Sequence, residues 1–588
     1  MIVAVRRGLH ERMASTLELP FFRLVSLFIA RTLDSGGKPG TEQLDFGIGL
    51  ILALLALPGA VVSILLFDKY SSLLQFFRGA RDFDSYAAAL PDEYFFIVLS
   101  MVVTGAVAVW WWDTIFLDRR DYLNLVPLPL STRRIFMANL TAILFLAVLF
   151  ALDVNAASSV LFPVVAAGAQ QSLTYLVRFA AVHALVVVLA SMFSFLSVFA
   201  VVGSLLLALP YAVFRQISLP ARIVLILGLL GLLSTSFAVS AVAGHLGEHP
   251  HSAVRFLPPV WFLGLCQILR QRADPSLTLM GHRALITLGC VFVVALATWA
   301  LSYGRVFSRI SAAPEIDTGR RAGLMGGVFS ALDGIVLLTP LQRAGYRFVI
   351  KTLLRNQRPG LVLGGFMGLG IVIASQTAFS ATNEVAGVIQ TLPSVDMLSI
   401  PLILSYWILL GLRVAFEIPV ELRANWIFEL SLDRNSTDVV PLARKMMVTV
   451  CLLGSLGLVF PAYLRVWGIA IGLGHTLFVC LAGAFLTEIL LLRLRKIPFT
   501  CPYPPFRDSA IVSVLICILG FIAYTVVSSN LAHWLLAGLA RMLLLPALSG
   551  LAWYGIHKIR QEIAVEQEPL SFEDQPEAFE LLKLSDGN

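Results

Sequence analysis

Apolar residues in this chain gather into about a dozen long runs, separated by short polar or basic segments. A bilayer's hydrocarbon core is roughly 30 Å thick, and a helix needs about 20 apolar residues to cross it. Because no water there can bind an open backbone, each run is predicted to be a helix. We predict an all-α polytopic membrane protein with about twelve transmembrane helices. The predicted spans are 46–67, 95–117, 136–165, 175–210, 221–243, 283–303, 361–380, 397–416, 446–464, 468–492, 508–528 and 531–557.

The distribution of basic residues predicts the orientation of these spans. Of the 43 Lys and Arg residues, 33 fall in the N-terminal segment, alternate loops and the C-terminal tail, counting span edges with the adjacent loop. The intervening loops hold 9. Cytoplasmic loops carry the excess of Lys and Arg, so both termini are predicted to be cytoplasmic. The exception is the predicted outer loop 244–282, which is also basic. Its apolar stretch Pro258–Leu269 is expected to lie along the membrane surface.

Two amphipathic segments divide the spans into two sets of six. Apolar residues recur at helical spacing among arginines in 11–31 and again in 332–358, and each segment directly precedes the first span of a set. A helix of this kind lies at the membrane surface as an elbow. The sequence around Thr114–Arg134 also resembles that around Trp426–Lys445, since both read Ile-Phe, Asp-Arg and Val-Pro-Leu before basic residues. Repeated halves are common in transport proteins.

We therefore predict three parts. The first membrane half covers 1–310, with its spans between about 46 and 303, and the second covers 311–557, with spans from about 361. The remainder, 558–588, is an acidic cytoplasmic tail whose polar, proline-broken composition is typical of segments without a packed core.

Composition narrows the classes of function. The 588 residues are 58% hydrophobic and 13% charged, against about 25% charged in soluble domains, which excludes a large soluble domain. The basic residues that give the chain its net charge of +7 flank the apolar runs. Their expected partners are therefore anionic lipid headgroups and not nucleic acid. The six cysteines are scattered without a C-x-x-C pair, and the H-x-x-E-H string at His245–His249 is broken by glycine and followed by proline. We predict no metal, no cofactor and no catalytic site in this chain.

The segment Asp118–Asn139 is the most informative motif. It is a short predicted cytoplasmic turn with two prolines and a Ser-Thr pair that can cap a helix starting near Arg133. Its apolar side chains have no lipid to enter if the turn projects into the cytoplasm, so a partner protein is expected to cover them. The predicted contact residues are Leu125, Val126, Leu128, Leu130, Arg133 and Arg134.

The Leu-Pro-Leu-Ser-x-Arg pattern at Leu128–Arg134, together with the preceding elbow, resembles the membrane subunit of ABC-2-type exporters. In that family an elbow precedes the first span, and a coupling helix between spans two and three docks on a separate ATPase. The second half offers only a weaker counterpart, with predicted contact residues Val440, Leu442 and Arg444. The chain has no G-x-x-x-x-G-K-[ST] phosphate loop, so ATP would be bound by a partner subunit.

The resemblance implies an exporter permease, expected in a bacterial cytoplasmic membrane, that moves a lipid, a polysaccharide or a hydrophobic small molecule. Two alternatives stay open: an ion-coupled secondary transporter with twelve spans, and a membrane assembly scaffold that transports nothing. The secondary transporter would depend on ionisable residues inside spans, which are expensive to bury and often functional. The intramembrane candidates are Asp153, His183 and Arg541. Asp113 and Glu488 lie near predicted cytoplasmic ends, where Arg119 or Arg493 can pair with them.

Overall fold

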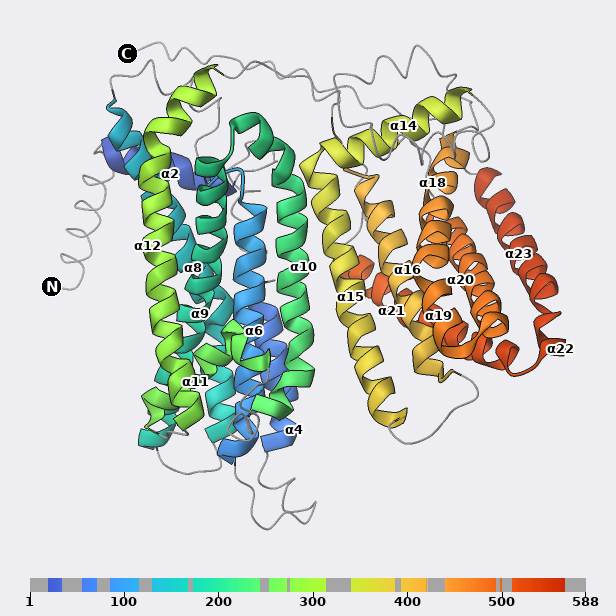
Figure 1. Ribbon diagram of the computed structural model, residues 1–588, viewed down its shortest axis with the longest axis horizontal. Coiled ribbons are helices and arrows are strands. Elements are labelled where there is room, and N and C mark those ends of the chain that lie inside the picture. The colour runs from blue at the N-terminus through green and yellow to red at the C-terminus, as the bar shows by residue number, and fades with distance from the viewer. Residues whose placement is uncertain are drawn as a thin grey trace. The chain divides into compact units, whose positions relative to one another are not determined.

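We describe the fold from a computed structural model, in which the chain divides into two compact units, Met1–Asp317 and Thr318–Asn588 (Figure 1). The predicted halves meet at 310/311. Throughout the described part of the chain the regular structure is helical, which confirms the all-α prediction. The structure describes residues 20–33, 55–70, 85–115, 130–167, 173–243, 253–271, 275–312, 340–385, 393–418, 420, 439–492, 498–499 and 510–565.

Ten helical segments within the described residues are long and apolar enough to cross a membrane. This confirms the prediction of an integral membrane protein. The sequence predicts twelve spans, two more than these ten segments. The two further predicted spans correspond to the helix around 55–70 and to the last helix of the chain. The ten segments are formed by α6, α8, α9, α10 and α12 of the first unit and α15, α16, α18–α19, α20 and α21 of the second.

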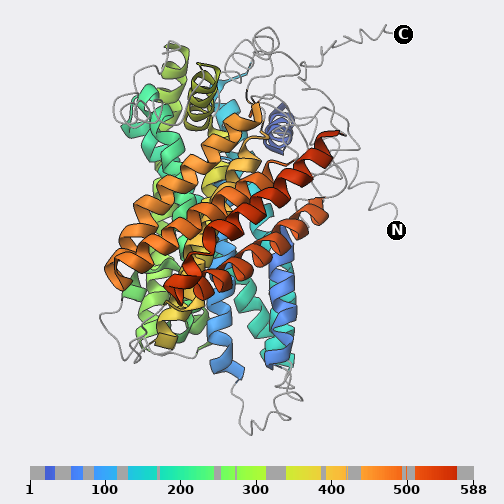
Figure 2. The same ribbon diagram turned by 90° about the vertical axis from the view of Figure 1, so that its right-hand side faces the viewer.

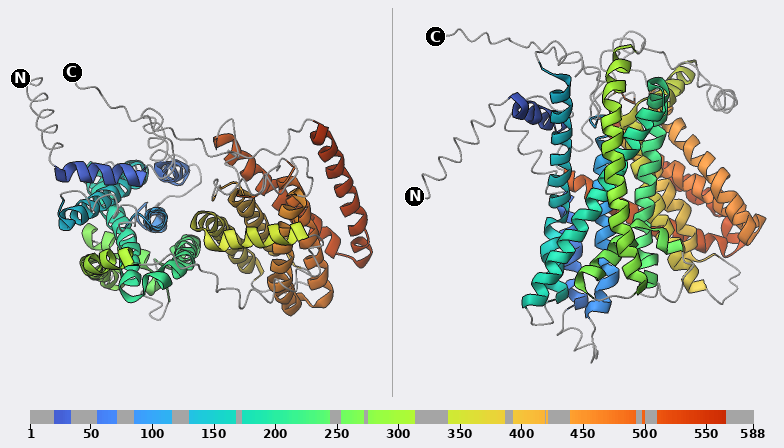
Figure 3. Two further views of the ribbon diagram at one scale, coloured as in Figure 1. Left: turned by 90° about the horizontal axis from the view of Figure 1, so that it is seen from above. Right: turned by 60° about the vertical axis from the view of Figure 1, so that its left-hand side comes forward.

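In the first unit, α6 and α9 lie at the centre and contact each other, with α8, α10 and α12 packed around them. Aromatic and aliphatic side chains such as Phe96, Phe162 and Val186 fill the space between the helices. The helix α2 runs crosswise at one end of this bundle and packs against α8, burying Leu24 and Phe28 (Figures 1 and 3). The helices are α2 (Pro20–Leu33), α4 (Phe67–Tyr70), α6 (Ser85–Trp110), α8 (Thr132–Ala167), α9 (Leu173–Ala208), α10 (Tyr211–Ala243), α11 (Pro258–Arg270) and α12 (Pro275–Ala312).

In the second unit, α16 is the central helix and contacts α15, α18, α20 and α21. A crosswise helix, α14, again lies at one end, with Tyr346 and Val349 buried (Figure 3). Figure 2 shows α18–α19, α20 and α23 running side by side. The helices are α14 (Pro340–Arg355), α15 (Gln357–Val385), α16 (Val395–Ala415), α18 (Val439–Gly454), α19 (Phe460–Trp467), α20 (Ile469–Leu490), α21 (Ala510–Leu536), α22 (Leu539–Met542) and α23 (Leu545–Val565).

The last two predicted spans are divided at a different place from the one expected. The sequence predicts a single span over 531–557, but α21 continues to Leu536 and α23 begins only at Leu545. Gly538 has an extended backbone between them, and Pro546 stands in the first turn of α23, a position that suits proline. The short helix α22 and its Arg541 therefore lie in the connection between two helices.

The apolar stretch of the 244–282 loop forms α11, and the prediction that it lies along the membrane surface is wrong. The helix packs against α6, α9 and α12. Its side chains are apolar around most of the helix, which suits a buried position better than an interfacial one. The helix ends at Gln271, whose φ of 60° is the left-handed conformation common after a helix. Its fully buried apolar residues are Val260, Phe262, Leu263, Leu265 and Cys266.

The hairpin of α11 and α12 depends on a close contact between Gly264 and Gly281. A Cβ on Gly264 would stand 2.3 Å from the carbonyl oxygen of Leu277 and 2.6 Å from the amide nitrogen of Gly281. A Cβ on Gly281 would in turn meet the backbone of Gly264 at 2.8 Å. Small residues at a crossing allow two helix backbones to touch, and here only glycine fits.

We predict that Gly264→Ala destabilises the protein by about 1–3 kcal/mol, because the added methyl group must push two backbones apart. Thermal unfolding of the purified protein in detergent measures the change. The matched control is Gly289→Ala in α12, where an added Cβ meets nothing within 4 Å. That variant should be unchanged or gain about 0.5–1 kcal/mol from helix propensity. Equal effects of the two substitutions would contradict the described packing of α11.

Candidate functional site

The predicted ATPase contact lies at the start of α8. Arg133 and Arg134 are exposed in the first turn of this helix, and Leu130 just before it is half-buried. The carbonyl of Ser131 accepts the backbone N–H of Arg134 at 2.9 Å, so the helix begins where the Ser-Thr pair predicts. The contact residues Leu125, Val126 and Leu128 lie outside the described residues.

The two ends of the 116–129 connection are held together by side chains. The Asn139 amide of α8 donates a hydrogen bond of 3.1 Å to the carbonyl of Ile115, just after α6. Asp113 pairs with Arg222 of α10, a helix remote in sequence; the expected partner, Arg119, lies outside the described residues. The Arg222 guanidinium also lies 5.4 Å from the ring centre of Trp112. This end of the first unit therefore joins α6, α8 and α10 into one platform.

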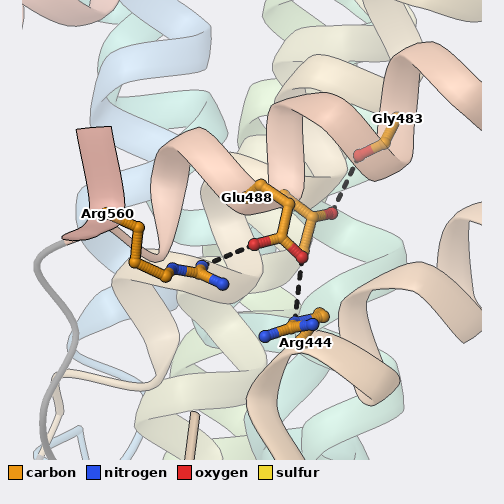
Figure 4. A network of polar contacts seen from close by, with 5 residues as sticks. Arg444, Gly483, Glu488 and Arg560 are labelled. Atoms are coloured by element: carbon orange, nitrogen blue, oxygen red, sulfur yellow. Dashed lines mark hydrogen bonds and ion pairs between the residues drawn. The ribbon is translucent and has the colours of Figure 1, made fainter. Parts of the chain in front are cut away.

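The counterpart in the second unit differs from the first. Arg444 of α18 turns toward Glu488 of α20, with its Nε 2.9 Å from Glu488 Oε1. Arg560 of α23 approaches the same carboxylate, with Nη2 2.5 Å from Oε2 (Figure 4). Glu488 is 3% exposed and pairs with these two arginines; the expected partner, Arg493, lies outside the described residues. Val440 and Leu442 lie in the first turn of α18, and their side chains are outside the described residues.

The intramembrane candidate Asp153 is not the polar residue at the centre of the first unit. It is partly exposed, and its Oδ2 accepts no hydrogen bond within the described part of the chain. Asn155, two residues later, is buried and donates a hydrogen bond of 2.9 Å to Ser191 of α9. Its carbonyl oxygen accepts a hydrogen bond from Ser100 of α6. Hydrogen bonds of this kind join helices in a membrane, so Asn155 links α6, α8 and α9.

His183 is fully buried in α9, as predicted for a deep position. Its ring centre lies 5.7 Å from that of Phe96 and 5.1 Å from that of Phe162. Neither ring nitrogen has a hydrogen-bond partner among the described residues. His475 of α20 has a similar environment, fully buried 4.7 Å from the ring centre of Tyr463.

Arg541, in contrast, is not a deep residue. It is exposed in α22, and its guanidinium lies 5.2 Å from the ring centre of Trp534. The prediction that Arg541 lies within the last span is therefore wrong. The physical reason is the break in helical backbone around Gly538, which places this arginine at the end of the helices.

The sequence reasoning missed a buried ion pair between Glu93 of α6 and Arg270 of α11. Glu93 is 0% exposed, and the side chain of Arg270 is almost completely buried. The guanidinium also lies 3.9 Å from the ring centre of Phe179 in α9. Hydropathy placed Glu93 just before the second span and Arg270 in a loop. One feature of the sequence could have indicated this pair. Arg270 ends an apolar run of helix length, and an arginine buried at such a position needs a carboxylate as its partner.

The neighbouring Asp92 holds the short helix α4 against α6. Lys69 Nζ lies 2.8 Å from Asp92 Oδ2, and the Tyr70 hydroxyl donates to the same oxygen at 2.5 Å. Burial and the Asp92 carboxylate raise the pKa of Tyr70, which keeps the phenol protonated as a donor. Asp92 and Glu93 thus bind α4 and α11 to α6 at one level of the bundle.

Chemically, this arrangement offers ion pairs and docking surfaces. Within the described residues, no group of three or more His, Cys, Asp or Glu side chains is placed to hold a metal ion. The His245–His249 string lies outside them. No protein-family model, curated protein or solved structure matches this chain.

We predict that removing either partner of the Glu93–Arg270 pair destabilises the protein by about 3–5 kcal/mol, because one buried charge is left uncompensated. The single variants are Glu93→Leu and Arg270→Met, and thermal unfolding in detergent measures both. The double variant should recover most of the loss, since apolar replacement of a buried pair is often neutral or stabilising. Additive losses in the double variant would show that the two charges do not interact.

Proposed function

We propose that this chain is the membrane-spanning subunit of an ABC-2-like exporter in a bacterial cytoplasmic membrane, driven by a separate P-loop ATPase. The observation that supports this proposal most directly is the packing of α2 against α8. A crosswise amphipathic helix thereby lies on the helix whose exposed first turn holds Arg133 and Arg134. Elbow and docking motif therefore meet on one element, as the resemblance to ABC-2 permeases implies.

The first unit is well built to transmit movement from its docking end. The helix α8 runs unbroken for 36 residues, so a displacement at Arg133 would be carried along the bundle. The platform formed by Asn139, Asp113 and Arg222 would move α6 and α10 with it. The Asn155 hydrogen bonds link the same helix to α6 and α9 deeper in the bundle.

The second unit supports a lesser role in docking. Its Arg444 is engaged by Glu488, whereas Arg133 and Arg134 of the first unit are exposed. We propose that Leu130–Arg134 is the principal ATPase contact and that Val440, Leu442 and Arg444 form a weaker one. The transported substrate would be a lipid, a polysaccharide or a hydrophobic small molecule, the classes that this family of exporters moves.

We predict that the double substitution Arg133→Glu and Arg134→Glu weakens binding of the partner ATPase by about tenfold or more, because reversed charges at an interface repel. The measurement is co-purification from the native membrane, with quantification of the ATPase and of its ATP hydrolysis. Arg465→Glu, an exposed charge reversal in α19, is the control and should change nothing. An ATPase retained equally by all variants, or absent from the wild-type protein, would overturn the proposal.

An ion-coupled secondary transporter is the second candidate, favoured by the buried Glu93–Arg270 pair and by the buried His183, which lies within electrostatic reach of Arg270 and has no hydrogen-bond partner among the described residues. It predicts charge movement without ATP when candidate solutes are applied to proteoliposomes on a solid-supported membrane. Under this alternative, His183→Gln abolishes the current while the protein remains folded. The exporter proposal predicts no solute-induced current in either protein.

A further inference from the structure

Three helices bring arginines to the end of α20 in the second unit. Arg444 comes from α18 and Arg560 from α23, and both approach Glu488. Arg413 of α16 donates from Nε to the carbonyl of Leu490 at 3.0 Å and pairs separately with Glu417. The carboxyl end of a helix carries partial negative charge, which attracts cations. A negatively charged carboxylate at this end of a helix is repelled by that partial charge. Glu488 is therefore stabilised there by its pairs with the two arginines.

The Arg444–Glu488–Arg560 cluster carries an unbalanced positive charge. Glu488 presents one oxygen to each guanidinium, and a single carboxylate neutralises only one of the two arginines. Figure 4 shows the carboxylate lying between the two guanidinium groups. Arg444 uses Nε and Arg560 uses one Nη, and the structure gives the other nitrogens of these two side chains no contact with the described residues.

Both arginine side chains are partly accessible. The side chains of Arg444 and Arg560 are 35% and 28% exposed, while Glu488 is buried between them. Guanidinium groups bind phosphate oxygens through paired N–H donors, and each of these two arginines keeps nitrogens that the Glu488 carboxylate does not use. The cluster therefore has the charge, the donors and the access that a singly charged phosphodiester requires.

The depth of the cluster indicates where that phosphate comes from. The apolar span of α18 begins at Ala443 and that of α20 ends at Leu490, so Arg444 and Glu488 lie at the edges of their spans. The residues next to the charged groups, Ile489 and Ile559, are exposed and apolar. Charged groups at the edge of a span beside exposed apolar side chains match the headgroup and the acyl chains of a phospholipid.

We propose that Arg444 and Arg560, held in place by Glu488, bind the phosphate of an anionic phospholipid headgroup and that this lipid fastens α23 to α18 and α20. The helix α23 needs such support. It exposes Leu551 and Tyr554 by about 70% each and packs chiefly on α20. The lipid would thus complete the charge balance of the cluster and hold the last helix of the chain. Arg444 also belongs to the weaker proposed ATPase contact, whereas Arg560 does not, and the lipid site is tested by bound lipid in the absence of the ATPase.

The test uses the full-length protein purified in a mild neutral detergent. Native mass spectrometry counts retained phosphatidylglycerol, and thermal unfolding is followed with phosphatidylglycerol, phosphatidylcholine or inorganic phosphate. We expect the wild-type protein to retain phosphatidylglycerol and to gain unfolding temperature from it alone. The double variant Arg444→Gln and Arg560→Gln should bind it about 30-fold more weakly, the scale expected when two cations facing an anionic headgroup are lost.

Two further variants make the outcome decisive. Lys558→Gln removes an exposed positive charge from the same helix and should behave as wild type. Arg560→Gln alone leaves the Arg444–Glu488 pair in place and should also bind phosphatidylglycerol more weakly; it decides the question if the double variant fails to fold. Equal stabilisation by phosphatidylcholine would overturn the proposal, and equal stabilisation by inorganic phosphate would overturn a lipid source. Unchanged binding in the double arginine variant, or in Arg560→Gln where the double variant does not fold, would also overturn it.

Discussion

A charge inside an apolar helical bundle must find its partner within the protein, and the two units depend on how this constraint is met. The hydrocarbon phase offers no water to pair with a carboxylate or a guanidinium. Glu93 therefore binds Arg270 and holds α11 inside the first unit. At the edge of its span, Glu488 is buried between Arg444 and Arg560 and joins three helices of the second unit. Apolar packing alone would allow these helices to slide or rotate, whereas each ion pair fixes one position.

The two units share a plan but differ at the ends that carry the crosswise helices. Each has an amphipathic helix, α2 or α14, that buries one face at the end of its bundle. In the first unit the adjacent basic residues, Arg133 and Arg134, are exposed. In the second the corresponding Arg444 is bound to Glu488. The exposed arginines of the first unit and the paired arginine of the second are the reason for proposing a stronger ATPase contact in the first unit than in the second.

The sequence was sufficient for the helices and insufficient for their partners. Long apolar runs located the helices because burial of the backbone requires helices of that length. The crosswise helix α14 falls within the predicted segment 332–358, and α2 overlaps the segment 11–31 and ends two residues beyond it. Hydropathy could not show that α11 is buried, because a run of 13 residues is too short to read as a span. Nor could it pair Asp113 with Arg222, since residues near in sequence seemed equally suitable partners.

The candidate site was predicted in part. The start of α8 and the exposure of Arg133 and Arg134 follow from the Ser-Thr pair and the adjacent basic residues. The buried Glu93–Arg270 pair was not found, because each residue alone looks like a loop residue beside a span. Arg541 was misplaced because an apolar run continues through the break at Gly538. In each failure the missing information is a tertiary contact, which composition and periodicity do not contain.

The most direct test of the proposed exporter is photo-crosslinking in the native membrane. A photoreactive phenylalanine replaces Leu130 at the start of α8, and a second protein carries it at Val466, an exposed position in α19. We predict that position 130 crosslinks to a P-loop ATPase, identified by mass spectrometry, and that position 466 does not. Crosslinking of position 130 to lipid alone, with the protein intact and folded, would contradict the assignment of this end of α8 as an ATPase contact.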